Sequence, residues 1–581
     1  MAGLIWTKRK RDMEATLILG RMPEGAQPEH FRAAGPWCFA GREKLFPGWE
    51  NSFQFAPEPL CDVNILAQTA REACAIFADN LPALAARLCP HSAALPDAYW
   101  ETLLAPWGVD VARQIADRWQ RVKAMTGTWG DLPLRVPLLP ENCAFRFAGE
   151  HDFTLYGSLG ISFNHWLFSR LLEACWPTAW RRKYLPPVNK VYGNSVPPAL
   201  KERVKHWARR ILLRLPFPRL KGVSLWQSLR FSLALAHTSR GQDSSLPLAA
   251  TFGAAATGAD AHLPLDPLPI FWAALPEAFT RLEHPRALRK SRTAPRLRVA
   301  SVLAYEDTIY RQKLAVWRGR GNRLMYVQHG SGYGQMRVAC LSAVVEYSQH
   351  AFATWGWNEH AGCRGNFISL PYPQVARIAG RWKGTGGKSL LFVGTEMPLF
   401  AYRLDSWPTP LQLLRYRNDK ARFFTVLKKD LHPRALYRPY FPVPGTLKDA
   451  DWLLPRFPRV RLCTGPLTRQ MLRCRVLVID HPGTTMLESL AADAPTVLYW
   501  SRDVWPQTSE HEELLGVLAE AGILHAGPEE AAAKVNSVFD DAPDWWKGET
   551  VQAARRQYCA RYAMTVAGSE NDCWVNTLTK L

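Results

Sequence analysis

Four short polar runs follow apolar, strand-like segments and carry the side chains best suited to chemistry. The first run follows 297–303 and contains Glu306 and Asp307. Two adjacent carboxylates at the end of a strand can supply a general base or a nucleophile, with one carboxylate tuning the pKa of the other. An acidic N-cap of the following helix explains Asp307 equally well. The run therefore predicts either a catalytic carboxylate or a helix cap.

The second run follows the segment 323–327 and begins with Gln328, His329 and Gly330, with further glycines at 332 and 334. Three glycines in five positions allow the backbone to approach a ligand closely. A histidine ahead of them can donate to a phosphate or accept a proton. The alternative is a structural histidine in a glycine turn, although one tight turn needs only one glycine.

The third run follows the segment 423–427 and contains Lys428, Lys429 and a His432-Pro433 dipeptide. If 423–427 is a strand, two lysines and a histidine at its end form an anion site that suits a nucleotide phosphate. The alternative is a solvated basic turn, because proline favours a turn directly after the histidine.

The fourth run follows the segment 476–479 and has the most specific local pattern, which is a strand, a Gly/Thr loop and a helix start. Its candidate donor-binding residues are Asp480, Gly483, Thr484, Thr485 and Glu488. Free backbone N–H groups at the positive end of a helix bind anions. Glu488 lies one turn into that helix, where it can reach a ribose hydroxyl, form a capping box with Thr485, or do both.

The elements that must position these residues are predicted from residue 296 onward, where short apolar runs alternate with loops and helical patterns. The predicted strands are 297–303, 323–327, 350–354, 389–393, 423–427, 459–462, 476–479 and 496–500. Such a pattern is typical of parallel sheets covered on both faces. A Pro/Gly-rich junction at 370–388 divides this half of the chain. Ligands of open α/β sheets bind at the carboxyl ends of strands, so we expect two Rossmann-like lobes facing a cleft.

The expected organisation is an α/β fold with a large helical elaboration at the N-terminus. Helical patterns occur at 64–88 and 109–124, and only 16–20 resembles a strand there. We predict a first lobe over 1–375, helix-rich to about 290 with a Rossmann-like core at 296–375 on the acceptor side. A second lobe over 388–540 would bind the nucleotide donor. A final helix within 541–581 would pack back on the first lobe.

Composition and charge limit the partners. The 581 residues carry a net charge of +21 and are 47% hydrophobic, which is a globular composition. The densest basic stretches lie at 181–183, 201–219 and 281–298. This charge suits nucleic acid, anionic lipid or phosphorylated substrates. The spacing of apolar residues in 201–215 fits either a solvated basic helix or an amphipathic helix on an anionic membrane surface.

Several classes are disfavoured by what the sequence lacks. No apolar run approaches the roughly 18–20 residues that cross a bilayer, and the start does not have the order of a secretory signal. The twelve scattered cysteines form no paired pattern, so we expect a reduced, cytoplasmic protein. A Walker-like run at 384–389 has Trp382 where the first glycine is required. No metal-ligand spacing and no nucleic-acid-binding motif is present, so we expect no metal and no nucleic acid partner.

The combination of motifs resembles nucleotide-sugar transferases of the GT-B architecture. The chain is most similar to a family of bacterial surface-carbohydrate transferases. That resemblance is carried by FNHWLF at 163–168, QHGSGYGQ at 328–335, TWGW at 354–357, DHPGTTMLESLAADAPTVLYW at 480–500 and the Trp545-Trp546 pair. It covers most of the chain, with a looser match in the first 150 residues. Pieces also resemble bacterial β-Kdo transferases, sialyltransferases and the teichoic-acid polymerases that use CDP-glycerol.

The resemblance implies roles for the candidate residues. Asp307 or Glu306 would be the base or nucleophile, and His329 would contact the donor or the reacting centre. His432 with Lys428 and Lys429 would hold the CMP phosphate, while Thr484, Thr485 and Glu488 would hold phosphate and ribose. In the CDP-glycerol enzymes the His-Gly turn implies that His329 activates the acceptor. Thr308 follows Asp307 where the sialyltransferase-type motif has glycine, which leaves the identity of the base open.

The expected function is transfer of a sugar, favouring a CMP-activated acidic sugar such as Kdo or a sialic acid. The expected acceptor is a surface polysaccharide, a lipopolysaccharide or a glycoprotein. A nucleotide sugar would be the co-substrate, with no other cofactor. We expect a cytoplasmic enzyme that contacts the anionic inner face of the cell membrane. The alternatives are a CDP-glycerol or ribitol-type phosphotransferase of the same fold and, more remotely, a basic nucleic-acid-binding protein.

Overall fold

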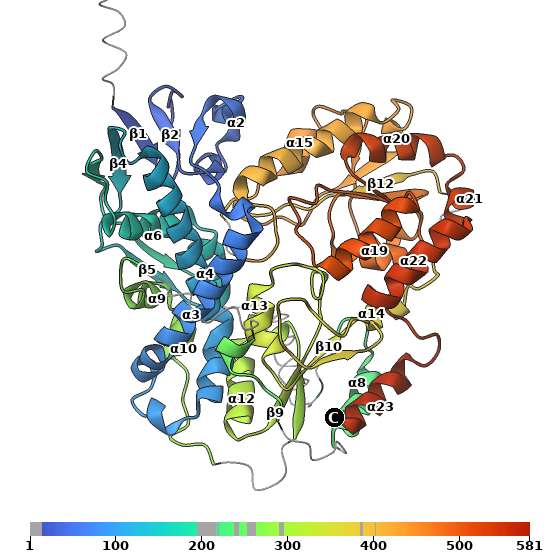
Figure 1. Ribbon diagram of the computed structural model, residues 1–581, viewed down its shortest axis with the longest axis horizontal. Coiled ribbons are helices and arrows are strands. Elements are labelled where there is room, and N and C mark those ends of the chain that lie inside the picture. The colour runs from blue at the N-terminus through green and yellow to red at the C-terminus, as the bar shows by residue number, and fades with distance from the viewer. Residues whose placement is uncertain are drawn as a thin grey trace, which may run out of the picture.

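The computed structural model describes residues 14–193, 217, 220–236, 243–251, 263–289, 296–383, 387–400 and 403–581. Most of the basic 201–219 stretch and part of the 384–389 run lie outside these residues. Within them the chain has an α/β fold built on three parallel sheets of four or more strands, with helices packed around them (Figure 1). The predicted α/β class is confirmed.

The middle sheet contains four parallel strands in the order β11-β10-β9-β8. Their bounds are β8 (Leu297–Ala300), β9 (Arg323–Val327), β10 (Ala351–Thr354) and β11 (Phe367–Ser369). Every residue of β9 and β10 is buried, as expected for strands covered on both faces. Helix α12 (Thr308–Gly319) connects β8 to β9. Because all the pairings are parallel, the loops that follow the strands meet at one edge.

The C-terminal sheet contains six parallel strands in the order β14-β13-β12-β15-β16-β17. Their bounds are β12 (Leu390–Val393), β13 (Ala435–Arg438), β14 (Arg461–Leu462), β15 (Val476–Ile479), β16 (Thr496–Tyr499) and β17 (Leu524–His525). Helix α15 (Pro410–Val426) joins β12 to β13, and α18 (Thr484–Ala491) joins β15 to β16. Strands β12 and β15 are adjacent at the centre of the sheet, so their loops share its carboxyl edge.

Most of the predicted strands are confirmed, and those at 323–327 and 476–479 have the predicted bounds. The predicted strand at 423–427 is wrong, because these residues form the last turn of α15 and its C-cap. A short buried apolar run does not by its pattern distinguish a strand from a helix face. Pro410 in the first turn and a capping box between Thr409 and Gln412 begin the helix that includes this run.

The N-terminal region contains a five-stranded parallel sheet that the sequence did not predict, in the order β3-β2-β1-β4-β6. Its strands are β1 (Ala15–Ile18), β2 (Phe31–Ala33), β3 (Gln54–Phe55), β4 (Leu134–Leu138) and β6 (Arg181–Tyr184). Only β1 coincides with a predicted strand. The others gave no clear pattern, because β3 has two residues and all four residues of β6 are exposed. A separate pair of strands, β5 (Ala144–Phe147) and β7 (Asn189–Tyr192), lies beside this sheet.

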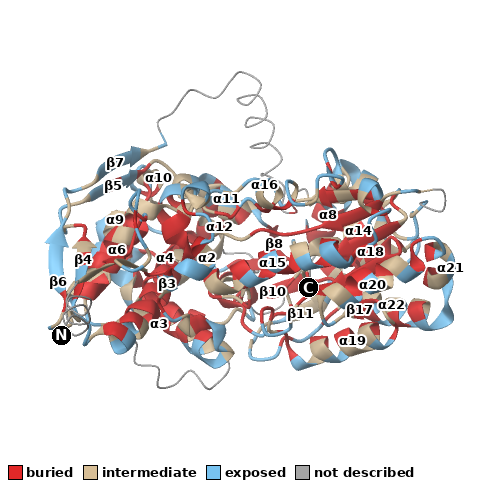
Figure 2. Cartoon of the chain, turned by 90° about the horizontal axis from the view of Figure 1, so that it is seen from above, coloured by how far each residue is buried: buried red, intermediate tan, exposed pale blue. Residues whose placement is uncertain are grey.

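Two long helices connect the N-terminal and middle sheets. Helix α3 (Val63–Leu88) and helix α4 (Asp97–Trp129) pack along each other, and α4 also packs on α12 of the middle sheet. Figure 2 shows α4 and the central strands as mostly buried. No helix among the described residues is both long enough and apolar enough to span a bilayer.

The C-terminal segment returns from the C-terminal sheet to the middle sheet. It contains α21 (Ala542–Lys547), α22 (Glu549–Tyr562) and α23 (Glu570–Lys580). Met564 N donates to Trp355 O at 3.0 Å, and Trp574 Nε1 donates to Pro371 O at 3.1 Å. Helix α23 packs against α8 (Leu225–Ala236). The segment therefore connects the two sheets whose carboxyl edges carry the candidate site.

Candidate functional site

The glycine-rich turn 328–334 directly follows β9 at the carboxyl edge of the middle sheet. Gln328 is buried, and its Oε1 accepts from Trp355 N at 3.0 Å and from Trp357 Nε1 at 2.9 Å. Its Nε2 donates to Gly330 O at 2.9 Å. Gln328 therefore fixes the shape of the turn and ties it to the end of β10.

Glycine is required at the far end of this turn for two reasons. Gly334 has a φ of 69°, and a Cβ added there would lie 2.6 Å from the Trp357 ring. By contrast, a Cβ added at Gly330 would have Thr484 Oγ1 as its nearest neighbour, at 3.7 Å. The turn is therefore tightly packed at its far end and opens toward the C-terminal sheet at Gly330.

His329 lies next to the buried carboxyl group of Glu346. Its Nδ1 is 3.6 Å from Glu346 Oε1, and the exposed fractions of the two side chains are 31% and 0%. The Tyr333 hydroxyl lies 3.1 Å from each ring nitrogen of His329. Desolvation, with a contribution from nearby Arg403, lowers the pKa of His329 to about 4. The imidazole is therefore neutral near pH 7 and able to accept a proton.

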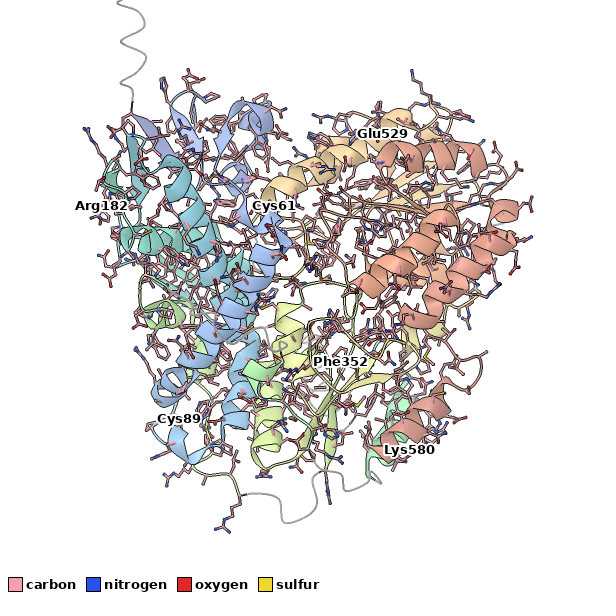
Figure 3. All side chains as sticks on the ribbon, in the orientation of Figure 1. Cys61, Cys89, Arg182, Phe352, Glu529 and Lys580 are labelled. Atoms are coloured by element: carbon pink, nitrogen blue, oxygen red, sulfur yellow. The ribbon has the colours of Figure 1, made fainter. Side chains whose placement is uncertain are left out.

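Aromatic side chains hold this part of the site. The Tyr333 ring stacks on Phe352 of β10 with ring centroids 5.3 Å apart, and Phe352 also meets Tyr347 edge-to-face. Figure 3 labels Phe352 within the middle sheet. Tyr347 ends a short π-helical segment, Ala343–Tyr347, that also contains Glu346. Segments of this kind are frequent at functional sites.

The loop after β15 provides the opposite side of the site. Asp480 is fully buried, and its Oδ1 accepts from Tyr416 OH at 2.5 Å and pairs with His481 Nδ1 at 2.9 Å. This contact leaves His481 Nε2 directed toward Gly483, because a Cβ at Gly483 would lie 2.4 Å from that nitrogen. Helix α18 then begins at Thr484, and no side chain caps its first turn. An anion can therefore be bound between the start of α18 and His481.

A buried cation lies beneath this loop. Lys420 of α15 is fully buried, and its Nζ pairs with Asp449, donates to Thr395 O at 2.7 Å and lies 3.9 Å from Asp480 Oδ2. Glu396 accepts from Asp449 N at 3.1 Å, and burial, together with the Asp449 charge, raises the pKa of Glu396 to about 7. These groups anchor Asp480 and, through it, the His481 ring.

The two loops are in direct contact. Ser331 N donates to Thr484 Oγ1 at 3.0 Å, which joins the turn of the middle sheet to the start of α18. Close by, Thr508 N donates to Gln335 O at 2.8 Å, and Gln335 Nε2 donates to Tyr558 OH of α22 at 3.1 Å. The structure thus brings together His329, Gly330, Asp480, Gly483, Thr484 and Thr485 of the residues that the sequence singled out.

Glu488 is mostly buried and paired with a lysine from another segment. Its side chain is 7% exposed and pairs with Lys221 Nζ at 3.3 Å. It also faces the Tyr372 hydroxyl, whose pKa is raised by burial and by the Glu488 charge. The predicted capping box with Thr485 is absent as well, because α18 begins one residue earlier with Gly483 as its N-cap. Glu488 instead connects α18 to neighbouring segments.

The structure favours the helix-cap interpretation of the 306–307 carboxylates. Asp307 is the N-cap of α12, and its carboxylate accepts from Tyr310 N at 2.9 Å. Glu306 is exposed at the end of the short helix α11 (Leu303–Glu306). Since Asp307 already binds a backbone N–H group, it is a poorer candidate for the catalytic base than the sequence indicated.

Lys428, Lys429 and His432 lie at the opposite edge of the C-terminal sheet from the 480–485 loop. They follow α15 and precede β13, so they occupy the edge where the parallel strands begin. His432 Nε2 lies 3.0 Å from Phe424 O and 3.2 Å from Leu427 O, and Lys428 Nζ donates to Asn536 O at 3.1 Å. The predicted phosphate site is corrected to a helix C-terminus whose last carbonyls are satisfied by a histidine.

Three functional candidates escaped the sequence analysis. Glu346 is a single charged residue within the apolar run 343–347, His481 belongs to the DHPGTT motif, and Lys420 lies within a helix. His481 could have been found, because it precedes a proline as His432 does and follows a true strand. The charge within an apolar run was the available indication for Glu346. Nothing in the sequence places Lys420 beside Asp480.

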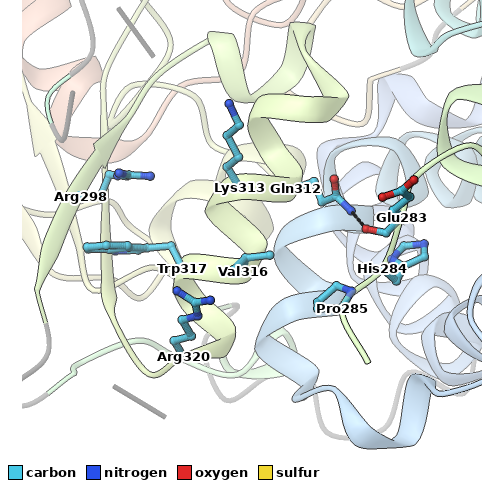
Figure 4. A pocket seen from close by; sticks show the side chains of 9 residues that line it. All are labelled: Glu283, His284, Pro285, Arg298, Gln312, Lys313, Val316, Trp317 and Arg320. Carbon is cyan, nitrogen blue, oxygen red and sulfur yellow. Dashed lines mark hydrogen bonds between the residues drawn. The ribbon is translucent and has the colours of Figure 1, made fainter. Parts of the chain in front are cut away.

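A pocket of about 610 Å³ lies apart from this site, against the outer side of α12 and the start of β8 (Figure 4). The Arg298 guanidinium lies 4.6 Å from the centre of the Trp317 ring. Lys313 and Arg320 add positive charge to the same pocket. Part of the basic 281–298 stretch therefore faces this pocket and not the carboxyl-edge loops.

Among the described residues, no three or more His, Cys, Asp and Glu side chains form a group that could hold a metal ion. Comparison with curated proteins gives no match. A family model described as the LIC12162 family transferase matches residues 15–578. This match includes all three parallel sheets and both loops of the candidate site. The chain therefore belongs to the LIC12162 family of transferases and is a transferase.

Proposed function

We propose that this transferase is a glycosyltransferase of the GT-B type, in which the middle and C-terminal sheets form the two lobes. The observation that carries the proposal is the contact between Ser331 N and Thr484 Oγ1, which brings the carboxyl-edge loops of two parallel sheets together. Ligands of open parallel sheets bind at this edge. A donor on one sheet and an acceptor on the other would meet there.

The C-terminal sheet would bind the nucleotide phosphate. The uncapped first turn of α18 offers backbone N–H groups, and the Thr484 and Thr485 side chains offer hydroxyls. His481, held by Asp480, is the histidine best placed to donate to the phosphate. The leaving group of the transfer reaction gains negative charge as the sugar departs, so hydrogen-bond donors at this point lower the barrier.

A CMP-activated acidic sugar, of the Kdo or sialic-acid class, is the favoured donor. Its support is the motif resemblance, together with the net charge of +21, which favours anionic substrates. The expected acceptor is a surface polysaccharide, a lipopolysaccharide or a glycoprotein. Transfer of glycerol phosphate or ribitol phosphate from a CDP donor is the second candidate, favoured by the histidine in the glycine-rich turn.

Nucleotide binding tests the donor site. We expect CMP to raise the melting temperature of the protein, because a ligand that binds only the folded state stabilises it by about 2.7 kcal/mol at a concentration of 100 Kd. His481→Ala should lose most of this shift. His432→Ala is the matched control, since it removes a histidine before a proline at the opposite edge of the same sheet, and it should keep the shift. The reverse result would move the phosphate site to His432 and refute the assignment.

The identity of the donor is tested by product release. CMP-Kdo, CMP-sialic acid, CDP-glycerol and UDP-glucose would each be incubated with the protein and a lipopolysaccharide or capsular acceptor, and the released nucleotide measured. Release of CMP from a CMP sugar, with the sugar found on the acceptor, supports the first proposal. If CMP were released only from CDP-glycerol, transfer of glycerol phosphate would replace sugar transfer as the proposed function.

A further inference from the structure

The carboxyl group of Glu346 is fully buried, which is costly in free energy for a charged group. Its neighbours Val344, Val345 and Tyr347 in the π-helical segment are buried as well. A carboxylate in such surroundings is destabilising unless other groups compensate it. A buried titratable group next to the carboxyl-edge loops is therefore a candidate for a function.

The groups that face Glu346 come from every element around it. Tyr305 is on α11 and Tyr326 is on β9. Tyr333 and His329 are in the glycine-rich turn, and Asp405 follows β12 of the C-terminal sheet. The Tyr333 and Tyr305 hydroxyls face the Glu346 carboxyl and lower its pKa, which offsets part of the rise caused by burial. His329 is the group through which Glu346 can act on a ligand, because 31% of the His329 side chain remains exposed.

The geometry points to a His329–Glu346 pair that activates an acceptor hydroxyl, with Glu346 as the positioning residue behind the base. This inference rests on the proposed function. Glu346 Oε1 lies 3.6 Å from His329 Nδ1, which is beyond hydrogen-bond distance but close enough for an ionised carboxylate to favour the tautomer with the proton on Nδ1. Nε2, which lies 3.1 Å from the Tyr333 hydroxyl, would then be the nitrogen that accepts the proton of the acceptor. As His329 becomes positively charged, the buried carboxylate stabilises it, as the aspartate does in the Ser-His-Asp arrangement.

The transfer step balances without another reactant. The acceptor O–H bond breaks and its proton moves to His329 Nε2, while the acceptor oxygen forms a bond to the anomeric carbon of the sugar. The bond between that carbon and the phosphate oxygen breaks, and its electron pair leaves with the nucleotide. The phosphate produced is held at the start of α18.

This pair fits the role that the sequence gave to Asp307. Asp307 caps α12, whereas Glu346 faces the histidine of the glycine-rich turn at 3.6 Å. Ser331, two residues after His329, contacts Thr484 of the donor loop. The base and the leaving group therefore lie on adjoining loops.

The pair predicts a characteristic pH dependence. Burial, with a contribution from Asp405, raises the pKa of Glu346 to about 8. The active form requires the ionised carboxylate, so kcat should rise with pH through a value near 8 that belongs to the pair. Tyr305, Tyr326 and Tyr333 have pKa values raised by burial and stay neutral over this range, as Arg403 stays charged.

Glu346→Gln tests the inference in the full-length protein. We expect kcat to fall by about 10²–10⁴-fold, with the CMP-induced melting shift and the donor KM unchanged. The rise near pH 8 should disappear, and Glu346→Asp should recover part of the rate. Glu101→Gln is the matched control, because Glu101 of α4 lines a small cavity with Val344 and Val345 and its pKa is also raised by burial. Unchanged kcat and pH profile in Glu346→Gln would overturn the inference and leave the proposed function intact.

A second measurement does not depend on transfer. The rate at which diethyl pyrocarbonate modifies His329 can be followed across pH by mass spectrometry of its peptide. In the natural protein the rate should rise near pH 8, where ionised Glu346 would favour the tautomer with the proton on Nδ1 and an unprotonated Nε2. Loss of this rise in Glu346→Gln supports the pair even if the donor proposal fails. Identical profiles for the two proteins would overturn the pair.

Discussion

Lys420→Met would test whether the buried charges of Lys420, Asp449 and Asp480 stabilise the 480–485 loop. The change keeps the length of the side chain and removes the cation that pairs with Asp449, bonds Thr395 O and lies 3.9 Å from Asp480. Asp449 and Asp480 are 3% and 0% exposed, so water cannot replace the lost ammonium. Breaking a buried ion pair by removing one partner costs about 3–5 kcal/mol. We expect a loss of this size, confined to the C-terminal sheet.

Hydrogen exchange is the suitable assay, because a chain with three sheets need not unfold in one step. A loss of about 3 kcal/mol accelerates exchange through opening by roughly 100-fold. Peptides that cover β12 and β15 should show this change, while peptides from β1 and β4 serve as internal controls. The double variant Lys420→Met/Asp449→Asn should recover part of the loss, since it removes one of the unpaired carboxylates.

Arg422→Met is the matched control on the same helix. Arg422 is 54% exposed, and its pairs with Asp419 and Glu529 are accessible to solvent. Exposed pairs contribute about 0–1 kcal/mol, so exchange in β12 and β15 should change little. If Lys420→Met exchanged no faster than Arg422→Met, the buried charges would not stabilise the 480–485 loop and the reasoning would be refuted.

Three further changes test other parts of the site. The pKa of Glu396 is raised to about 7, so its protonated carboxyl stabilises the folded state fully below about pH 4.5, and this stabilisation is lost as pH rises through 7. Glu396→Gln should remove this pH-dependent loss of stability in melting curves recorded from pH 4 to 8. Gln328→Ala leaves Trp355 N and Trp357 Nε1 without their acceptor and should lower the free energy of unfolding by about 2–4 kcal/mol, measured by denaturant unfolding. An unchanged denaturation midpoint would contradict the positioning role of Gln328. Gly334→Ala should destabilise by about 1–3 kcal/mol, while Gly330→Ala, which meets nothing closer than 3.7 Å, should leave the melting temperature nearly unchanged.

Three of the four polar runs could be placed from sequence because a confirmed strand precedes each of them. The β9 and β15 segments are apolar, short and bounded by turn residues, which together specify a parallel strand and the edge at which its loop lies. Once these strands were recognised, the loops at 328 and 480 were expected at carboxyl edges. The contact between Ser331 and Thr484 follows from how the two sheets pack, and local sequence does not encode that packing.

The errors have physical causes that differ from one residue to another. The apolar run 423–427 is compatible with a strand or with a buried helix face, and it was interpreted as a strand. His432 was therefore placed at the wrong edge of its sheet. Asp307 satisfies a backbone N–H group, which a carboxylate does at many helix starts irrespective of function. Lys420 and Asp480 are 60 residues apart in sequence and meet only because β12 and β15 are adjacent. The N-terminal sheet has strands too short or too exposed to leave a periodic pattern.

The two histidines of the site are held by carboxylates in opposite environments, and this difference fits their proposed tasks. His481 pairs with Asp480, which has a buried lysine 3.9 Å away and a tyrosine hydroxyl at 2.5 Å. Such a network holds the ring in one orientation, as binding a phosphate throughout the reaction requires. His329 faces Glu346, whose pKa is raised by apolar surroundings. A carboxyl that changes charge near the working pH suits a residue that must assist proton transfer.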